Sequence, residues 1–359
     1  MKYEKFKISF CTVCMNRLHH LKQTLPQNIE DNIDYGNIEF VILNYNSQDG
    51  IDEWITANFS EYIDNEILTY IKTKQPKHFQ MSHSKNVVAK HANGNIVCNV
   101  DADNFLGKGF ANFINKNFKT DENIYLAVDK KIAPRDCYGR ICVRKADFMY
   151  LRGYDESMTG YGFEDFDFRN RLGLLGRKTI YISNEKYLKA LIHDDKTRLK
   201  NEPNAVQIEK VYIHYIKHYT SELLYLFKDG IFFRGRIVLN RLSNSKSIDN
   251  LFIENRTFEF GNRLENNIWD IGEWKQIERC LYLVGSNQKK QTLIEIDHKR
   301  LVVKNREDIC FYRITNRALF ENVLMFFSQI NNRIKMEKNR FDNKLLVNLN
   351  SFGETTLLK

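Results

Sequence analysis

Short β-rich runs alternate with helical stretches through the first 200 residues of this 359-residue chain. Alternation of this kind is typical of an α/β domain, in which helices cover a largely parallel sheet. The predicted strands are residues 7–14, 38–45, 67–73, 95–101, 124–128, 140–144 and 178–182. We therefore expect the N-terminal part of the chain to fold around one central sheet.

The pattern changes after residue 230, where short alternating runs are separated by polar turns. These runs predict a small antiparallel β domain, with strands at 276–284, 291–296, 301–304 and 309–314. A chain of this length is also too long for one small core. We therefore expect two domains, residues 1–220 and residues 221–359.

Two stretches in the second half have apolar residues at helical spacing. Residues 205–227 predict an amphipathic helix, and residues 317–340 predict a long basic helix near the C-terminus. We interpret the basic helix as a solvated helix with one buried face, and membrane anchoring is the alternative.

The composition is that of a folded globular protein. The hydrophobic fraction of 43% and the charged fraction of 28% exclude wholesale disorder. No run of 18 apolar residues and no signal-peptide core is present, so we expect neither a membrane span nor secretion by that route. The net charge of +9 suits an anionic partner such as a nucleotide, a membrane surface or a nucleic acid.

The seven cysteines are too sparse for a disulfide scaffold, which agrees with a reducing compartment. Cys11 and Cys14 form a Cys-x-x-Cys pair within a predicted strand. Their odd spacing places the thiols on opposite faces of that strand, and no second pair completes a zinc site.

Two carboxylates one residue apart, Asp101 and Asp103, end the predicted strand at 95–101. Carboxylates are costly at the end of a buried strand unless something positive lies beside them. Oxygen ligands of this kind suit Mg²⁺ or Mn²⁺ bridging a diphosphate, with few protein ligands and several waters. An acidic turn after a strand is the simpler alternative.

A second acidic pair follows a segment rich in glycine and aromatic residues. Gly160 and Gly162 permit a tight loop, after which Glu164 and Asp165 open a predicted helix at 164–175. Acidic residues also stabilise the first turn of a helix without any catalytic role. That alternative does not account for the loop that precedes them.

These segments together resemble the nucleotide-sugar domain of GT-A glycosyltransferases, specifically the large inverting family 2. The resemblance spans residues 5–205, and it is carried by the first strand, by Lys85-Asn86 and by Asp101-x-Asp103. It implies an α/β GT-A (Rossmann-like) domain with a mixed central sheet, followed by the smaller β-rich domain with its C-terminal helix.

The sequence departs from the family pattern at two donor-site positions. Lys85 stands where the family usually has arginine, and Asn44 stands where it has an acid that binds the nucleoside. An amide can still form a hydrogen bond with a pyrimidine edge. The donor-site residues that the resemblance implies are Thr12, Asn44, Asn46, Asp49, Lys85, Asn86, Asp101 and Lys196.

The resemblance also implies a metal site that holds Mn²⁺ or Mg²⁺. Asp103 matches the principal ligand, with Asp101 beside it. His193 follows an apolar run and taken alone is more often structural, but in GT-A enzymes a histidine in this region often completes the metal shell.

The segment from Gly153 to Arg169 resembles the Gly-aromatic-Gly-x-Glu-Asp region of galactosyltransferases, also found in chondroitin-polymerase-like bacterial enzymes. By position, Asp165 matches the catalytic base and Glu164 matches the acceptor ligand. Tyr161 matches an aromatic residue that stacks on sugar, and Gly162 lies beside it in the acceptor loop.

The resemblance implies an inverting, metal-dependent hexosyltransferase, of the galactosyl or N-acetylhexosaminyl type. The donor would be a nucleotide sugar, with UDP as the expected nucleotide, and the acceptor a saccharide or lipid-linked glycan of a surface polysaccharide. The enzyme would be cytoplasmic, with peripheral contact at the inner membrane face and no nucleic-acid partner. The rival hypothesis is a non-catalytic GT-A-like subunit that binds nucleotide sugar or glycan.

Overall fold

The computed structural model describes residues 5–129, 131–192, 199, 203–217, 220–239, 258–259 and 269–358. The chain divides into two compact units, one comprising Met1–Asp194 and Lys335–Lys359 and the other Asp195–Ile334. The expected domains, 1–220 and 221–359, differ from these units in two places. The chain from Asp195 onward, which includes residues before 221, belongs to the second unit. The C-terminal residues Lys335–Lys359 belong to the first unit.

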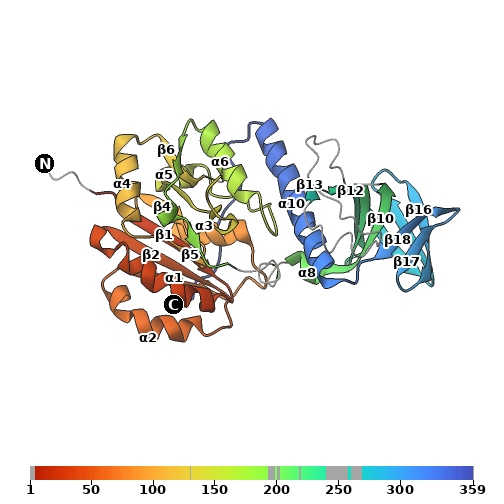
Figure 1. The fold of residues 1–359 in the computed structure, drawn as a ribbon, viewed down its shortest axis with the longest axis horizontal. Coiled ribbons are helices and arrows are strands. Elements are labelled where there is room, and N and C mark those ends of the chain that lie inside the picture. The colour runs from red at the N-terminus through yellow and green to blue at the C-terminus, as the bar shows by residue number, and fades with distance from the viewer. Residues whose placement is uncertain are drawn as a thin grey trace. The chain divides into compact units, whose positions relative to one another are not determined.

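The first unit is built on a seven-stranded mixed sheet of order β3-β2-β1-β4-β7-β6-β8 (Figure 1). β1 is parallel to β2 and β4, and β2 is parallel to β3. β7 is antiparallel to β4 and β6, whereas β8 is parallel to β6. The strands are β1 (Ile8–Cys14), β2 (Ile38–Tyr45), β3 (Leu68–Thr73), β4 (Ile96–Asn99), β6 (Ile124–Val128), β7 (Ile141–Arg144) and β8 (Lys178–Ile182). The mixed central sheet that the sequence predicts is confirmed.

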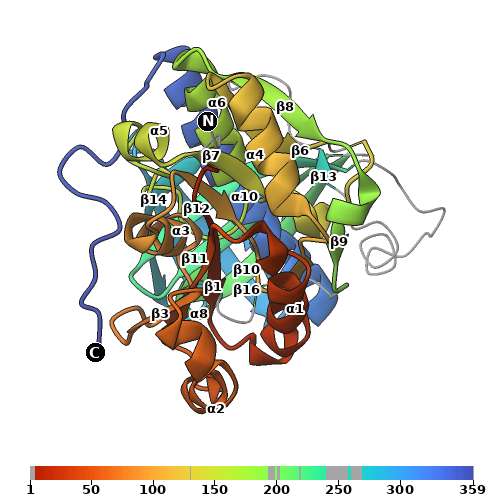
Figure 2. The ribbon, with the colours of Figure 1, turned by 90° about the vertical axis from the view of Figure 1, so that its left-hand side faces the viewer.

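Helices cover both faces of this sheet (Figure 1, Figure 2). One apolar cluster joins the sheet to α1, α2 and α4, and another joins it to α3, α5 and α6. Cys14 belongs to the first cluster and Cys11 to the second, so the two thiols lie on opposite faces as predicted. The helices are α1 (Leu18–Glu30), α2 (Ile51–Asp64), α3 (Met81–His91), α4 (Phe110–Thr120), α5 (Lys145–Tyr150) and α6 (Glu164–Leu174), and a small sheet pairs β5 (Asn104–Phe105) with β9 (Lys189–Ala190).

The start of α1 is fixed by a carboxylate from another loop. Asn16 adopts φ 56° before the helix, which begins at Leu18. The Leu18 backbone N–H donates to Asp49 Oδ2, 2.7 Å away, in the loop after β2. A carboxylate from another loop therefore satisfies a free N–H at this helix start.

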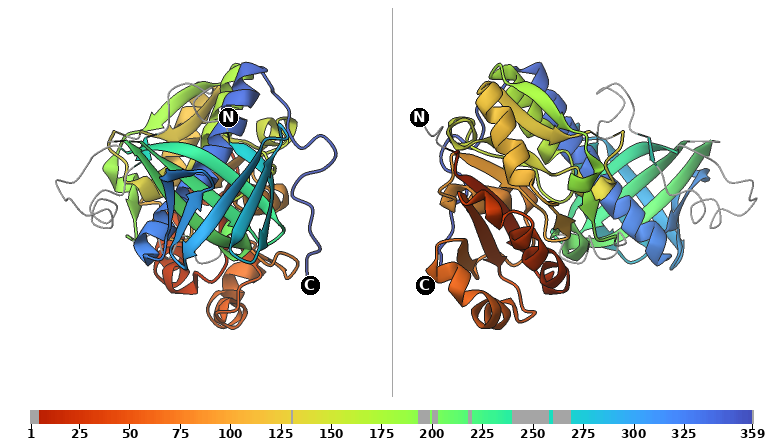
Figure 3. Two further views of the ribbon diagram at one scale, coloured as in Figure 1. Left: turned by 90° about the vertical axis from the view of Figure 1, so that its right-hand side faces the viewer. Right: turned by 60° about the vertical axis from the view of Figure 1, so that its left-hand side comes forward.

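The second unit is a closed antiparallel sheet (Figure 3). Its strands follow the order β11-β10-β18-β17-β16-β15-β14-β12, and β12 pairs back onto β11. Apolar side chains from Leu224, Phe232, Leu283 and Phe311 fill its core. The strands are β10 (Ile208–Lys217), β11 (Thr220–Phe227), β12 (Ile231–Leu239), β13 (Phe258–Glu259), β14 (Asp270–Ile277), β15 (Cys280–Gly285), β16 (Lys290–Asp297), β17 (Arg300–Val303) and β18 (Arg306–Arg313).

The prediction of a helix at residues 205–227 was wrong. A short helix α8 (Pro203–Gln207) is followed by the paired strands β10 and β11. Val211, Tyr212 and Ile213 are buried in succession, so both faces of β10 are covered. A strand buried on both faces lacks the alternation of apolar and polar residues from which a strand is predicted.

The predicted C-terminal helix is confirmed as α10 (Arg317–Phe341). From Lys335 onward the chain belongs to the first unit. Residues 342–358 extend past α3 to β3, where Leu358 forms an antiparallel bridge with Lys72 (Figure 2). Within the described residues, no helix combines the length and the apolarity that crossing a membrane requires.

Gly94 connects α3 to β4 directly against β1. A Cβ at this position would lie 2.4 Å from Ser9 Oγ and 2.8 Å from the Lys7 carbonyl oxygen. The Gly94 N–H also donates to Ser9 Oγ at 2.7 Å. At Gly173 in α6, by contrast, a Cβ would meet no atom within 4 Å.

We expect Gly94→Ala to lower the free energy of unfolding by about 1–3 kcal/mol, because the added methyl overpacks the contact with β1. Gly173→Ala is the matched control, and it should raise that free energy by about 0.5–1 kcal/mol, because alanine favours a helix. Denaturant unfolding of both variants measures the difference. Equal effects would show that the Gly94 turn has room to move.

Candidate active site

A buried lysine joins α3 to the start of α6. Lys85 Nζ donates to Glu164 Oε1 at 3.0 Å and to Asp165 Oδ1 at 2.8 Å. The exposed side-chain fractions are 4% for Lys85, 6% for Glu164 and 17% for Asp165. The ring of Tyr154 lies 5.1 Å from the same ammonium group. The structure thus brings a predicted donor-site residue onto the predicted acceptor and base residues.

The loop before α6 explains why this acidic pair lies there. Gly160, Gly162 and Phe163 adopt positive φ values of 74°, 95° and 71°, a conformation that favours glycine. Helix α6 then starts at Glu164, so both acids occupy its first turn. The tight loop predicted from the two glycines is confirmed.

Asp101 and Asp103 lie in a turn just beyond β4. The Asn104 N–H donates to the Asp101 carbonyl at 2.9 Å, and the Asn104 side chain donates to Asp103 Oδ1 at 2.8 Å. Asn99 Nδ2 donates to Asp101 Oδ1 at 3.2 Å and to the Gly139 carbonyl at 3.1 Å. Amide side chains therefore orient both carboxylates.

Gly139 is the backbone position around which the two acidic motifs meet. A Cβ at residue 139 would lie 3.0 Å from Asp101 Oδ2, 3.4 Å from Asp165 Oδ2 and 3.5 Å from Lys85 Nζ. Three groups from the β4 turn, α6 and α3 thus surround one point. The importance of Gly139 was missed by sequence reasoning, because the residue belongs to no motif.

Burial is the main cause of the perturbed acidity of this cluster. It raises the pKa of Asp165 to about 7, with a further increase from Glu164, against which Lys85 acts. Burial and the neighbouring Asp103 also raise the pKa of Asp101, again against Lys85. A carboxylate with a pKa near neutrality is suited to take up a proton at physiological pH.

Asp101 and Asp103 fit the ligand preference of Mg²⁺ or Mn²⁺, because both are carboxylates in one turn and such ions keep several waters. Among the residues that the structure describes, no group of three or more His, Cys, Asp or Glu side chains is arranged to hold a metal. The predicted residues His193 and Lys196 lie outside the described residues.

Asn44, at the end of β2, is linked to a carboxylate that the sequence analysis did not single out. Its Nδ2 donates to Asp52 Oδ1 at 2.9 Å, and its Oδ1 accepts from the Ser47 N–H at 2.8 Å. The Tyr70 hydroxyl donates to the same Asp52 oxygen at 2.5 Å. Asp52 lies in the first turn of α2, so the only sequence signal was an acid shortly after the β2 motif.

The other predicted donor residues have mainly structural contacts. Thr12 is buried on β1, Asn46 Nδ2 donates to the Pro76 carbonyl at 2.8 Å, and Asp49 caps α1. Asn86 donates to the Tyr154 carbonyl and to Glu156, and accepts from the Tyr154 N–H. These bonds fix the loops around the cluster.

Tyr161, the predicted acceptor-stacking residue, is partly buried in the loop before α6. The guanidinium carbon of Arg135 lies 5.6 Å from the centroid of its ring, within the range of a cation–π contact. Arg135 is exposed on the short helix Arg135–Cys137, and no sequence motif pointed to it.

Residues 9–136 match the family model of Glycosyl transferase family 2. This match supports the predicted resemblance over a range that contains Asp101 and Asp103. The Gly160–Asp165 segment lies outside that range, so its resemblance stays a prediction. No curated protein matches the chain.

Three similar solved structures have low sequence identity. The mannosyltransferase PcManGT from Pyrobaculum calidifontis, in complex with GDP-Man and Mn²⁺, is 18% identical, with 51% of this chain and 56% of that chain covered and a TM-score of 0.42. Residues 1–349 of S. aureus TarS, in complex with UDP, are 15% identical, with 53% of this chain and 62% of that chain covered and a TM-score of 0.43. A second structure of S. aureus TarS is 11% identical, with 86% of this chain and 85% of that chain covered and a TM-score of 0.42. The chain thus spans less than two thirds of the first two matched structures.

The raised pKa of Asp165 predicts a pH-dependent stability. The unfolded chain loses this proton near pH 4 and the folded protein near pH 7, so stability falls as the pH rises through that window. Asp165→Asn removes this titration, so its gain in melting temperature over wild type should be larger at pH 8 than at pH 5. Thermal unfolding at both values measures it, and a gain that does not change with pH would contradict the assignment.

Proposed function

We propose that this protein is an inverting, metal-dependent glycosyltransferase that moves a hexose from a UDP-sugar to a saccharide hydroxyl. The convergence of Asp101, Asp165 and Lys85 around Gly139 carries this proposal. It joins the predicted metal motif to the predicted base through one buried lysine. The family 2 match over residues 9–136 supports the nucleotide-sugar side of the reaction.

Asp103 and Asp101 would hold Mn²⁺ or Mg²⁺, with His193 as a further ligand. When bound, the ion supplies positive charge that stabilises the leaving diphosphate. Asn104 and Asn99 keep the two carboxylates oriented through their side-chain amides. Lys196 is proposed to contact the same donor phosphates.

Asp165 acts as the general base in this proposal. As the acceptor hydroxyl oxygen forms a bond to the anomeric carbon, its proton passes to Asp165 and the bond to the diphosphate oxygen breaks. Attack from the face opposite the leaving group inverts the anomeric centre. A pKa of about 7 leaves Asp165 able to accept that proton near neutral pH.

Glu164 and Tyr161 complete the acceptor side, Glu164 by accepting hydrogen bonds from sugar hydroxyls and Tyr161 by stacking. Because the first turn of α6 fixes Glu164 and Asp165 as neighbours, acceptor binding and proton removal are adjacent. Lys85 contacts both acids and holds them in place.

The Asn44–Asp52 pair is proposed to read the nucleobase. Asp52 supplies the carboxylate that position 44 lacks, and its side chain is 40% exposed. A carboxylate accepts the hydrogen bond that the N–H of uracil donates. This arrangement favours a UDP-linked donor.

The biological setting proposed is synthesis of a surface polysaccharide or lipid-linked glycan at the cytoplasmic face of a membrane. The transferred sugar is proposed to be galactose or an N-acetylhexosamine. The alternative, a non-catalytic subunit that binds nucleotide sugar or glycan, leaves the buried base unexplained. Product formation from a panel of UDP-sugars and acceptors separates the two.

Asp165→Asn keeps the size of the side chain and removes the base. We expect kcat on the true acceptor to fall by about 10²–10⁴-fold, with donor KM near the wild-type value. Glu164→Gln should mainly raise acceptor KM. Steady-state kinetics with both substrates varied measure these effects, and normal transfer by both variants would place the base elsewhere.

Asp103→Ala should weaken Mn²⁺ binding about tenfold or more, because it removes a metal ligand from a turn outside the hydrophobic core. Calorimetric titration of Mn²⁺ in the absence of substrate measures the loss. Asp34→Ala, which removes an exposed acid that belongs to neither motif, is the control and should bind Mn²⁺ like the wild type. Equal affinities in all three proteins would overturn the metal assignment.

A further inference from the structure

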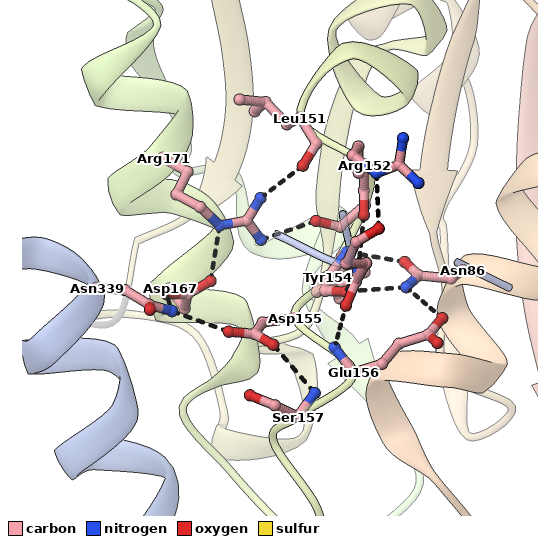
Figure 4. A network of polar contacts seen from close by, with 12 residues as sticks. Asn86, Leu151, Arg152, Tyr154, Asp155, Glu156, Ser157, Asp167, Arg171 and Asn339 are labelled. Carbon is pink, nitrogen blue, oxygen red and sulfur yellow. Dashed lines mark hydrogen bonds and ion pairs between the residues drawn. The ribbon is translucent and has the colours of Figure 1, made fainter. Parts of the chain in front are cut away.

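The last turns of α10 place an asparagine between two buried carboxylates of the first unit. Asn339 Nδ2 donates to Asp155 Oδ2 and to Asp167 Oδ1, each at 2.9 Å (Figure 4). The exposed fractions are 7% for Asn339, 4% for Asp155 and 1% for Asp167. One amide group thus satisfies two carboxylates that would otherwise repel each other in a low-dielectric interior.

Arg171 completes this arrangement from within α6. Its Nε donates to Asp167 Oδ2 at 2.8 Å, and its terminal nitrogens donate to the carbonyls of Leu151 and Gly153 (Figure 4). Asp155 Oδ1 accepts from the Ser157 N–H at 3.0 Å. The start of α6 and the loop that leads to it are therefore fixed to one network, in which the Asn339 amide bridges the two carboxylates.

A second asparagine from the C-terminal segment holds the same loop. Asn348 Nδ2 donates to the carbonyls of Arg152 and Tyr154 at 2.9 and 2.7 Å. Its Oδ1 accepts from the Glu156 N–H at 3.0 Å. The Gly353 N–H then donates to Glu156 Oε1 at 2.7 Å. These bonds fix the backbone from Arg152 to Glu156.

The loop and helix held in this way carry the candidate active site. The Tyr154 ring lies 5.1 Å from Lys85 Nζ. Asp167 lies in the same first helical turn as Glu164 and Asp165. A shift of Asp155 or Asp167 would therefore displace Tyr154 or the acidic pair.

We infer that residues 335–358 form a positioning element for the Lys85–Glu164–Asp165 cluster, with Asn339 and Asn348 as its positioning residues. The effect on catalysis rests on the proposed function, whereas the effect on the loop does not. Neither asparagine contacts the cluster directly, so each acts through the residues that it holds.

The test compares Asn339→Asp and Asn339→Gln with wild type. The aspartate variant places a third carboxylate where the shared donor was, whereas the glutamine variant keeps an amide. Asn58→Asp, the same change at an exposed position on α2, controls for added charge. Amide hydrogen exchange over residues 151–167 and steady-state kinetics are measured at a temperature where every variant is folded.

Asn339→Asp should raise exchange by at least tenfold over residues 151–167 and lower kcat by at least tenfold, while donor KM stays within twofold. Asn339→Gln should recover most of the lost kcat, and Asn58→Asp should match wild type. Unchanged exchange in Asn339→Asp would overturn the positioning role whatever the activity. Raised exchange with normal kcat would show that Asn339 stabilises the loop without positioning the cluster for catalysis. A wild-type protein that transfers no sugar would contradict the proposed function instead.

Discussion

The ion cluster of Lys85 with Glu164 and Asp165 is the interaction on which the rest of the candidate site depends. Charged groups with little exposure are costly to bury, and the contacts of Lys85 with the two acids at 2.8 and 3.0 Å offset part of that cost. The lysine comes from α3 and the acids from α6, so the cluster requires both helices to pack on the same face of the sheet. Their shared apolar cluster provides that packing.

The elements that local sequence determines could be predicted. The seven strands of the central sheet follow from their β-rich runs, and the loop before α6 follows from Gly160 and Gly162. Asp101, Asp103, Glu164 and Asp165 could be singled out because each pair is local. What the sequence could not provide was the partner of each group, since Lys85 and Glu164 are 79 residues apart.

The failures have physical causes of the same kind. The hairpin of β10 and β11 was predicted as a helix because consecutive residues are buried on both faces of its strands, which removes the alternation of a half-buried strand. Asp52 was missed because it is marked out by its hydrogen bond with Asn44, which the sequence does not show. The C-terminal segment was missed because Asn339 and Asn348 form hydrogen bonds with backbone and carboxylate groups far away in the sequence, which no periodic pattern records.

The charge balance around Gly139 connects the stability of the protein to its proposed chemistry. Asp101, Glu164 and Asp165 oppose the single ammonium of Lys85, so negative charge is in excess within the cluster, and burial magnifies its cost. Burial is the main cause of the raised pKa of Asp101 and of Asp165, and the neighbouring carboxylates raise both pKa values further, against Lys85. A divalent cation beside Asp101 would balance the carboxylates and lower the pKa of Asp165, so binding would ready the base for the acceptor. The excess of negative charge that is costly in the isolated protein would therefore favour the cation of the proposed function.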